Sequence, residues 1–310
     1  MDPRFADRTL ALTGGTGALG RRLVEALATA GAREVRVLTR EPKAPARLGA
    51  VTHVRGDLRD GTGLAELLAG ASGVFHLAAM KRVDDCEANP REAVRTNVIG
   101  SMNLVDAALA NPGIEWVIGA SSVSACAPVN VYGLTKSLME RLLHEADPPR
   151  GPAFAAVRLP SVWNTPGSVL DIWRRSVSET GAIPVTDPDM TRFAITPDEA
   201  IELLLAAATD PPRGGVVVPD AAAYRLADLA AEFAESRGAS VRPVGARPGE
   251  KQHEDLISYE EAPFSRMSER GYVISPGTRQ VGIRPVSSAH ARRLDRTALR
   301  RLVRSDHVVA

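Results

Sequence analysis

Tyr132 and Lys136 lie four residues apart in the stretch "VYGLTK". On a helix, residues at this spacing share a face, so both side chains would point the same way. A free phenol titrates at about pH 10 and is a poor base at neutral pH, but a nearby ammonium group favours the phenolate. The pair therefore predicts a site in which Tyr132 takes a proton from a substrate hydroxyl while a hydride leaves the same carbon. Ser122, ten residues before Tyr132, ends a β-rich run and is expected to orient that hydroxyl.

A glycine-rich segment indicates where the hydride acceptor would bind. The stretch "TGGTGALG" (13–20) follows an apolar run and opens a helical pattern. Glycines permit a tight turn and a close backbone approach to a pyrophosphate, and the helix N-terminus offers unpaired N–H groups. The context therefore predicts a dinucleotide cradle formed by Gly14, Thr16, Gly17, Ala18, Leu19 and Gly20.

Thr39 and Arg40 end the second predicted strand and bear on which dinucleotide binds. An acid at this position would hold the 2′-hydroxyl of NAD, whereas a small polar residue followed by Arg suits the 2′-phosphate of NADP. We therefore expect NADP, with NAD left open by Glu41. Further cofactor contacts are expected from the ends of the next strands and from the site itself, at Asp57, Leu58, Ala78, Ala79, Lys81, Tyr132 and Lys136.

The first half of the chain alternates strand and helix patterns. Strands are predicted at 9–15, 34–40, 51–58, 73–79, 115–122 and 154–162, and helices at 19–31, 63–70, 91–110 and 131–146. This alternation predicts a doubly wound parallel sheet covered by helices on both faces. After residue 165 prolines become frequent and the regular alternation of strands and helices ends. We expect a Rossmann-type domain at 1–165 and a smaller α/β substrate-binding lobe at 166–310, part of which packs back on the first domain.

Composition narrows the class of protein. The chain has 310 residues, 44% of them hydrophobic, with 38 basic against 37 acidic residues, so its charge suggests neither a nucleic acid nor an anionic membrane as partner. Its two cysteines, Cys86 and Cys126, do not have metal-ligand spacing, and no metal is expected. No apolar run reaches the roughly 20 residues of a membrane span. We expect a cytoplasmic protein with a small-molecule substrate.

The chain resembles the extended short-chain dehydrogenase/reductase superfamily. Within it, the chain is similar to the polysaccharide-biosynthesis group of nucleotide-sugar dehydratases and epimerases, including the UDP-N-acetylglucosamine 4,6-dehydratases. The resemblance covers almost the whole chain and rests on "TGGTGALG", "GDLRD", "HLAAMKRVDDCEANPREAVRTNVIGSMNLVDAA", "VYGLTK", "DPDMTRFAIT" and "RPGEKQHEDLIS". It implies transient oxidation of a sugar hydroxyl, reaction next to the ketone, return of the hydride, and a homo-oligomer.

Two departures from the family pattern affect the chemistry. The dehydratases typically carry Ser-Thr-Asp-Lys before the tyrosine, whereas this chain has Val123 and Ser124 in place of the Asp–Lys acid–base pair. The sixth strand of the family ends in Arg-x-Gly-Asn, and here Ser161 replaces the Asn. Lys81 matches a family lysine and is our first candidate for the missing base. His76 and Cys126 are expected to be packed and inert.

The resemblance also implies where the substrate binds. Arg192 and the "RPGEK" residues Arg247, Glu250 and Lys251 are the candidates for holding phosphate, because guanidinium groups match phosphate geometry. We also expect Ser124 and Asn164 to contact the substrate.

Three functions follow from these residues. We favour an NADP-dependent dehydratase acting on the sugar of a nucleotide sugar or nucleoside. An epimerase using the same transient ketone is the alternative, because it needs fewer acids and bases. A retained oxidation is a further enzymatic option. A cofactor-sensing regulator is disfavoured, since such proteins generally lack the tyrosine–lysine pair.

Overall fold

The computed structural model describes residues 4–41, 47–280 and 282–304. Its centre is a ten-stranded sheet with the order β15-β16-β11-β7-β6-β5-β1-β2-β4-β3. Seven strands run parallel: β1 (Thr9–Thr13), β2 (Glu34–Thr39), β4 (Val51–Arg55), β5 (Gly73–His76), β6 (Trp116–Ser122), β7 (Ala153–Leu159) and β11 (Val216–Pro219). The strands after β1 are added on one side of it (β2, then β4), and those from β5 onward are added on its other side, so the strand order reverses between β1 and β5. This confirms the predicted doubly wound fold, in which ligands bind outside the carboxyl ends of the strands at such a reversal.

Burial explains why these segments form strands. Every residue of β1 (TLALT) and of β7 (AFAAVRL) is buried. Strands covered on both faces read as continuous apolar runs, as in all-parallel sheets. The covering helices are α1 (Ala18–Thr29), α2 (Leu64–Leu68), α5 (Gly100–Leu109), α6 (Val131–Ala146) and α8 (Pro197–Thr209).

The helix predicted at 91–110 is interrupted. The structure has α3 (Val83–Ala88), α4 (Pro90–Val94), a π-helical turn at Arg95–Ile99, and then α5. The Asn97 side chain within this turn bonds to both backbone groups of Met80, accepting from its N at 2.7 Å and donating to its O at 2.9 Å. Such bulges are frequent at functional sites, and this one ties the helix to the loop after β5.

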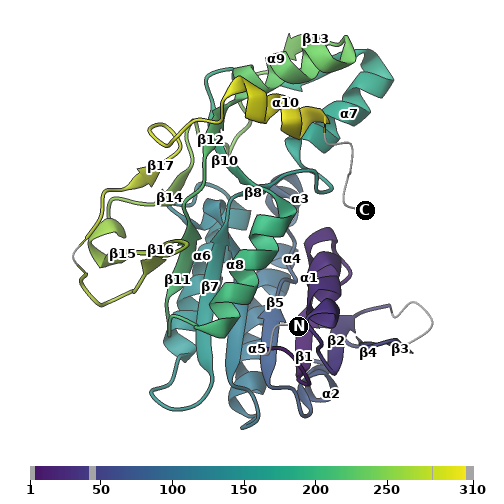
Figure 1. The fold of residues 1–310 in the computed structure, drawn as a ribbon, viewed down its shortest axis with the longest axis vertical. Coiled ribbons are helices and arrows are strands. Elements are labelled where there is room, and N and C mark those ends of the chain that lie inside the picture. Colours follow the sequence, from purple (N-terminus) through teal and green to yellow (C-terminus); the bar gives the residue numbers. More distant parts are fainter. Residues whose placement is uncertain (1–3, 42–46, 281, 305–310) are drawn as a thin grey trace.

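The smaller lobe lies at the carboxyl ends of the main strands (Figure 1). It contains the sheet β12-β10-β8, formed by β8 (Ser161–Val162), β10 (Thr191–Ile195) and β12 (Ala223–Arg225). Two pairs accompany it: β9 (Ala182–Val185) with β13 (Ser240–Pro243), and β14 (Asp255–Ile257) with β17 (Val286–Ser287). The helices are α7 (Val169–Thr180), α9 (Leu226–Arg237) and α10 (Arg296–Arg304), and a second apolar core includes Trp163, Trp173 and Phe233.

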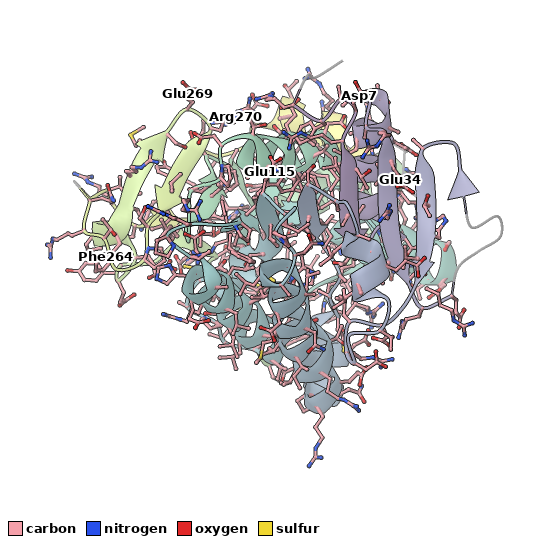
Figure 2. All side chains as sticks on the ribbon, turned by 90° about the horizontal axis from the view of Figure 1, so that it is seen from below. Asp7, Glu34, Glu115, Phe264, Glu269 and Arg270 are labelled. Atoms are coloured by element: carbon pink, nitrogen blue, oxygen red, sulfur yellow. The ribbon has the colours of Figure 1, made fainter. Side chains whose placement is uncertain are left out.

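Residues beyond 166 contribute to both parts of the molecule. Helix α8 packs on β6 and β7, and β11 extends the parallel sheet. The antiparallel hairpin of β15 (Ser265–Ser268) and β16 (Gly271–Ile274) then continues the same sheet, and the short β3 (Arg47–Leu48) pairs antiparallel to β4 at the other edge. Figure 2 shows Phe264 and Glu269 of the hairpin region at one end of the sheet and Glu34 of β2 towards the other.

Candidate active site

A pocket of about 1460 Å³ opens at the carboxyl ends of the parallel strands, between the main sheet and the smaller lobe. All residues predicted above as catalytic or cofactor-binding line it. The predicted substrate-binding residues also line it, with one exception. That exception is Asn164, which is buried in the lobe and whose Oδ1 accepts a bond from Arg174 at 2.8 Å. The fold therefore gathers residues from six strand ends into one cavity.

The glycine segment has the geometry of a phosphate cradle. Gly14 has φ +75°, and a Cβ at Gly20 would lie 2.2 Å from the Gly14 carbonyl oxygen, so both positions need glycine. A Cβ at Gly17 would meet only the Gly14 oxygen, at 3.4 Å, because this position faces the pocket. Gly17 caps α1 without a side-chain hydrogen bond, and no acid occupies the first turn. The helix N-terminus thus suits an anionic group, and these residues fit a dinucleotide pyrophosphate.

One end of the pocket, beside the carboxyl ends of β2 and β4, carries charges of both signs. Asp57 accepts hydrogen bonds from Arg59, whose guanidinium also bonds Glu92 on α4. The Arg59 side chain holds the pKa of Asp57 below its ordinary value, although burial opposes this. Arg40 also lines the pocket, and within the described ranges no ion pair to it is found.

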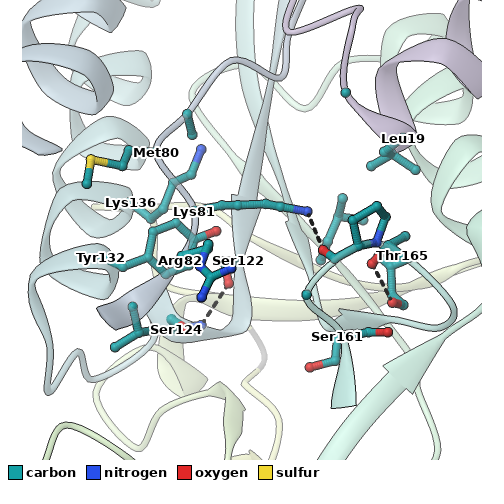
Figure 3. A pocket seen from close by; sticks show the side chains of 18 of the residues that line it. Leu19, Met80, Lys81, Arg82, Ser122, Ser124, Tyr132, Lys136, Ser161 and Thr165 are labelled. Carbon is teal, nitrogen blue, oxygen red and sulfur yellow. Dashed lines mark hydrogen bonds between the residues drawn. The ribbon is translucent and has the colours of Figure 1, made fainter. Parts of the chain in front are cut away.

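Helix α6 begins at the site and presents the tyrosine to it. Asn130 caps the helix by accepting a bond from the Gly133 N at 2.8 Å. Ser122, at the end of β6, lies beside the Tyr132 phenol (Figure 3) and acts to lower its pKa, and its Oγ accepts a bond from the Ser124 N at 3.2 Å. Figure 3 shows Tyr132, Ser122 and Ser124 together on one wall, with Ser161 and Thr165 opposite. A hydroxyl placed between the walls would meet both Tyr132 and Ser122.

Lys136 is buried beside β6. Its Nζ donates to the Ala120 carbonyl at 2.7 Å, and the residue is 3% exposed. Burial raises the pKa of Tyr132 to about 12, with Ser122 acting in the opposite direction. Burial also lowers the pKa of Lys136 to about 8, opposed by the charge of Glu140. Desolvation therefore shifts both groups towards their uncharged forms, and the expected lowering of the tyrosine pKa by this lysine stays a prediction.

A buried polar network lies behind the site and was not foreseen from the sequence. The His76 ring joins Thr13 Oγ1 at 2.7 Å to Ser101 Oγ at 2.8 Å, and burial lowers its pKa to about 3, so the ring is neutral. Asn97 Nδ2 donates to Thr135 Oγ1 at 2.9 Å. These bonds connect β1, β5, α5 and α6, which agrees with the packed role expected for His76.

Lys81 crosses the pocket. Its side chain extends past Tyr132, and its Nζ donates to the Pro166 carbonyl at 3.2 Å on the opposite wall (Figure 3). Burial lowers the pKa of Lys81, and Arg82 adds to the effect. The acids that follow it along the chain are engaged elsewhere: Asp84 with Arg247 at 3.3 Å, Asp85 with Arg82 at 3.2 Å, and Glu87 with the Val131 N at 2.6 Å.

The predicted anion-binding residues of the smaller lobe face the pocket but are already partnered. Arg247 pairs with Glu250 at 3.4 Å, and Lys251 Nζ donates to the Cys126 carbonyl at 2.5 Å. Arg192 lies 3.8 Å from Glu254, a pocket residue that the sequence did not single out. Burial raises the pKa of Glu254, with Arg192 opposing it. A bound phosphate would compete with these carboxylates for the cations.

Neither cysteine has the properties of a reactive thiol. Burial raises the pKa of Cys86 to about 11 and raises that of Cys126 well above its ordinary value. The Cys126 thiol donates to Glu261 at 3.3 Å. In the part of the chain that the structure describes, no group of His, Cys, Asp and Glu side chains could hold a metal ion.

Comparison with known proteins gives the family context. Residues 10–276 match the model of a family described as polysaccharide biosynthesis protein. The chain is 32% identical over 272 residues to UDP-glucose 4-epimerase of Rickettsia typhi, covering 83% of this chain and 80% of that protein. It is 30% identical over 288 residues to UDP-N-acetylglucosamine 4,6-dehydratase (inverting) of Campylobacter jejuni, covering 89% and 85%.

Solved structures share the fold. Pen from Bacillus thuringiensis superposes with a TM-score of 0.90 at 28% identity, covering 99% of both chains. MoeE5, in complex with UDP-glucuronic acid and NAD, superposes with a TM-score of 0.70 at 26% identity, covering 79% of this chain and 88% of that one.

One further relative is described as an uncharacterized membrane protein of Methanocaldococcus jannaschii. It is 35% identical over 290 residues, covering 88% of this chain and 87% of that protein. Among the described residues of the present structure, no helix combines the length and apolar character needed to cross a membrane.

Proposed function

The chain belongs to the polysaccharide biosynthesis protein family, and from this premise we propose that it is an NADP-dependent dehydratase acting on the sugar of a nucleotide sugar or nucleoside. The reaction oxidises a sugar hydroxyl transiently, eliminates water next to the resulting ketone and returns the hydride. One observation carries the proposal: a single pocket holds the glycine cradle, the Tyr132–Ser122 pair and Lys81. A bound nicotinamide dinucleotide supplies the acceptor and donor of hydride.

Tyr132 and Ser122 would handle the hydroxyl proton. Ser122 lies at the end of the buried strand β6 and beside the phenol (Figure 3), so the substrate hydroxyl would be oriented between the two oxygens. Tyr132 takes the hydroxyl proton during oxidation and gives it back during reduction. Because burial favours the protonated phenol, activation of Tyr132 requires Lys136 to be charged.

Lys81 would act as the base for the acidified C–H. It is the amine that spans the pocket, and burial lowers its pKa, so that a larger fraction is neutral than for an exposed lysine. The leaving hydroxide then needs one proton, which the protonated Lys81 amine can return, so a single residue balances the elimination. Val123 has no group that moves a proton, and Ser124 cannot act as the base without another residue to accept its proton.

Epimerisation is the second candidate. Replacement of the family's Asp–Lys pair by Val123 and Ser124 favours it, and the similarity to UDP-glucose 4-epimerase is as strong as that to the dehydratase. An epimerase needs the same transient ketone but loses no water.

Product analysis in deuterated water distinguishes these functions. The enzyme is incubated with NADP or NAD and with UDP-N-acetylglucosamine or UDP-glucose, and the products are measured by mass spectrometry. Loss of the mass of one water supports dehydration, while unchanged composition with one deuterium gained supports epimerisation through proton exchange. Product that forms only in proportion to added cofactor would contradict both proposals and indicate a plain dehydrogenase.

The role of Lys81 is tested with a matched pair of variants. Lys81→Met removes the amine, whereas Lys81→Arg keeps a cation that can still bond the Pro166 carbonyl but cannot act as a base near neutral pH. We expect both variants to lose dehydration at least about 100-fold. Full activity of Lys81→Arg would show that the residue only anchors the opposite wall.

The preference for NADP rests on Arg40. Arg59 is held by two carboxylates, so Arg40 remains for the 2′-phosphate. We expect Arg40→Gln to weaken NADP binding about 10-fold or more and to leave NAD binding within about 2-fold. Equal losses for both cofactors would contradict the assignment.

We also propose a homo-oligomer. Apolar side chains are exposed on neighbouring helices, at Val94, Ile99 and Met102 along α4 to α5 and at Leu134 and Leu138 on α6. A second copy would cover this surface. Light scattering on the wild type and on Met102→Glu/Leu138→Glu tests it, and a wild-type mass of one chain would contradict it.

A further inference from the structure

A buried ionic cluster lies behind the catalytic strand. Arg158 of β7 is 1% exposed and donates to two carboxylates, that of Glu140 on α6 at 2.7 Å and that of Glu261 at 2.8 Å. Its remaining donors reach Glu140 at 3.1 Å, Glu261 at 3.0 Å and the Leu256 carbonyl at 2.7 Å. A guanidinium has five N–H donors, so this one is fully used. The cluster joins α6 to the C-terminal segment that follows β14.

The cluster reaches the site through Glu140. Tyr132, Lys136 and Glu140 are spaced by four residues along α6 and share its face. The Ser121 hydroxyl donates to Glu140 at 2.5 Å, and Ser121 lies between Ala120, whose carbonyl accepts from Lys136, and Ser122. The Glu140 carboxylate and the Lys136 amine are thus held by two consecutive residues of β6, Ser121 and Ala120.

The charges in the cluster do not cancel. One guanidinium lies between two carboxylates, which leaves an excess of one negative charge. Burial works against ionisation of Glu261, but the Arg158 hydrogen bond holds the pKa of Glu261 below its ordinary value. The Cys126 thiol that donates to Glu261 stays protonated, since burial raises its pKa. The excess charge is therefore retained at neutral pH, on the side of α6 that carries Lys136.

We propose that Glu261 is a positioning residue: by neutralising Arg158 it leaves the charge of Glu140 available to hold Lys136 as an ammonium. Without Glu261, Arg158 and Glu140 would form a neutral pair, and burial would drive Lys136 towards the uncharged amine. The C-terminal segment, which also carries Lys251, would in this way control the proton-handling pair. The inference rests on the proposed role of Lys136, but its test needs no substrate.

The other titratable groups that act on Lys136, on Tyr132 or on the Cys126 thiol beside the cluster must also be considered. From β5 comes His76, neutral because burial lowers its pKa to about 3. From α3 comes Cys86, which acts on Tyr132 and is neutral because burial raises its pKa to about 11. Lys251 acts on Cys126 from the lobe side. Among these groups, Glu140 is the anion whose charge raises the pKa of Lys136.

The experiment measures the titration of Lys136 directly. The sequence contains few lysines, at positions 43, 81, 136 and 251. Their Cε signals can be followed by NMR in ¹³C-lysine-labelled protein, and Lys136→Arg assigns the signal of interest. In Glu261→Gln we expect the titration midpoint of Lys136 to fall by about 0.5 to 1 pH unit relative to the wild type.

Two control variants separate this effect from general damage. Glu232→Gln removes another buried carboxylate bound by two arginines, Arg296 and Arg300, but between α9 and α10. Glu261→Asp keeps the charge. Both should leave the midpoint within about 0.2 pH unit of the wild type. If Glu261→Gln does not fold, Glu140→Gln replaces it, with a fall of at least the same size expected.

An unchanged midpoint in a folded Glu261→Gln protein, or an equal fall in Glu232→Gln, would overturn the proposal. Failure of the proposed function has a different signature: no turnover of any nucleotide sugar, with the midpoint shift still present.

Discussion

Two glycines of the cradle allow a prediction in which one substitution affects chiefly cofactor binding and the other affects the stability of the fold as well. Gly17 and Gly20 lie three residues apart at the start of α1, yet their surroundings differ. A methyl group at Gly17 would project into the pocket and meet only the Gly14 carbonyl oxygen, at 3.4 Å, an ordinary contact distance. At Gly20 it would lie 2.2 Å from the Gly14 oxygen and 2.6 Å from the Gly15 Cα, distances that the backbone cannot accept without moving.

The expected magnitudes follow from these contacts. Gly20→Ala overpacks backbone against backbone and should reduce the free energy of unfolding by about 3 kcal/mol, the upper end for inserted methylenes. For a chain of this size the corresponding fall in Tm is roughly 5 °C. Gly17→Ala should lower Tm by only about 2 °C, because loss of a favourable helix N-cap residue costs about 1 kcal/mol in a chain of this size. It should, however, raise the Kd for NADP at least about 10-fold, since a methyl group would displace a phosphate from the N–H groups of α1.

The assay combines thermal unfolding without ligand with fluorescence titration of NADP. Gly17→Ala would keep a Tm close to that of the wild type and lose affinity, whereas Gly20→Ala would lose both. Wild-type affinity in a folded Gly17→Ala protein would refute the placement of the pyrophosphate at the N-terminus of α1. A wild-type Tm for Gly20→Ala would refute the close approach of Gly20 to the backbone of Gly14 and Gly15.

Three further predictions follow from the site. Tyr132→Phe should lower kcat by about 100- to 10,000-fold while the Kd for NADP stays within about 2-fold, measured by turnover and titration; normal turnover would exclude the phenol as the proton-handling group. The folded-state pKa of Lys136, about 8, lies below its ordinary 10.5, so burial of the ammonium lowers the free energy of unfolding at pH 7, and this cost is relieved as pH rises from about 8 to 10. In urea unfolding, a Lys136→Met variant should be more stable than the wild type by about 2 to 3 kcal/mol at pH 7, and the difference should shrink by pH 10. Cys126→Ser, which keeps a hydroxyl donor near Glu261, should retain turnover within about 3-fold, and a loss of about 100-fold would reassign the thiol as a catalytic acid.

The sequence was sufficient for the main sheet and for the close turn of the glycine segment. The parallel strands follow from continuous apolar runs, which only a sheet covered on both faces produces, and the glycines at 14 and 20 follow from turns that no larger residue can make. Spacing along α6 also placed Tyr132 and Lys136 on one face. Apolar runs, glycine turns and helix spacing are local properties, so a few neighbouring residues of the sequence are enough to predict them.

Tertiary structure decided what those residues can do. The fold directs Lys136 to the Ala120 carbonyl and buries it together with Tyr132. Burial raises the pKa of Tyr132 to about 12 and lowers that of Lys136 to about 8, so each group is shifted towards its uncharged form. It also brought Glu261 to within 2.8 Å of Arg158, across 103 residues of chain. Desolvation and long-range charge pairing depend on which segments pack together, and no spacing along the chain encodes them. The sequence therefore predicted most of the named residues that line the pocket, but not Glu254, and it wrongly included Asn164; their electrostatic environment was set only by the folded protein.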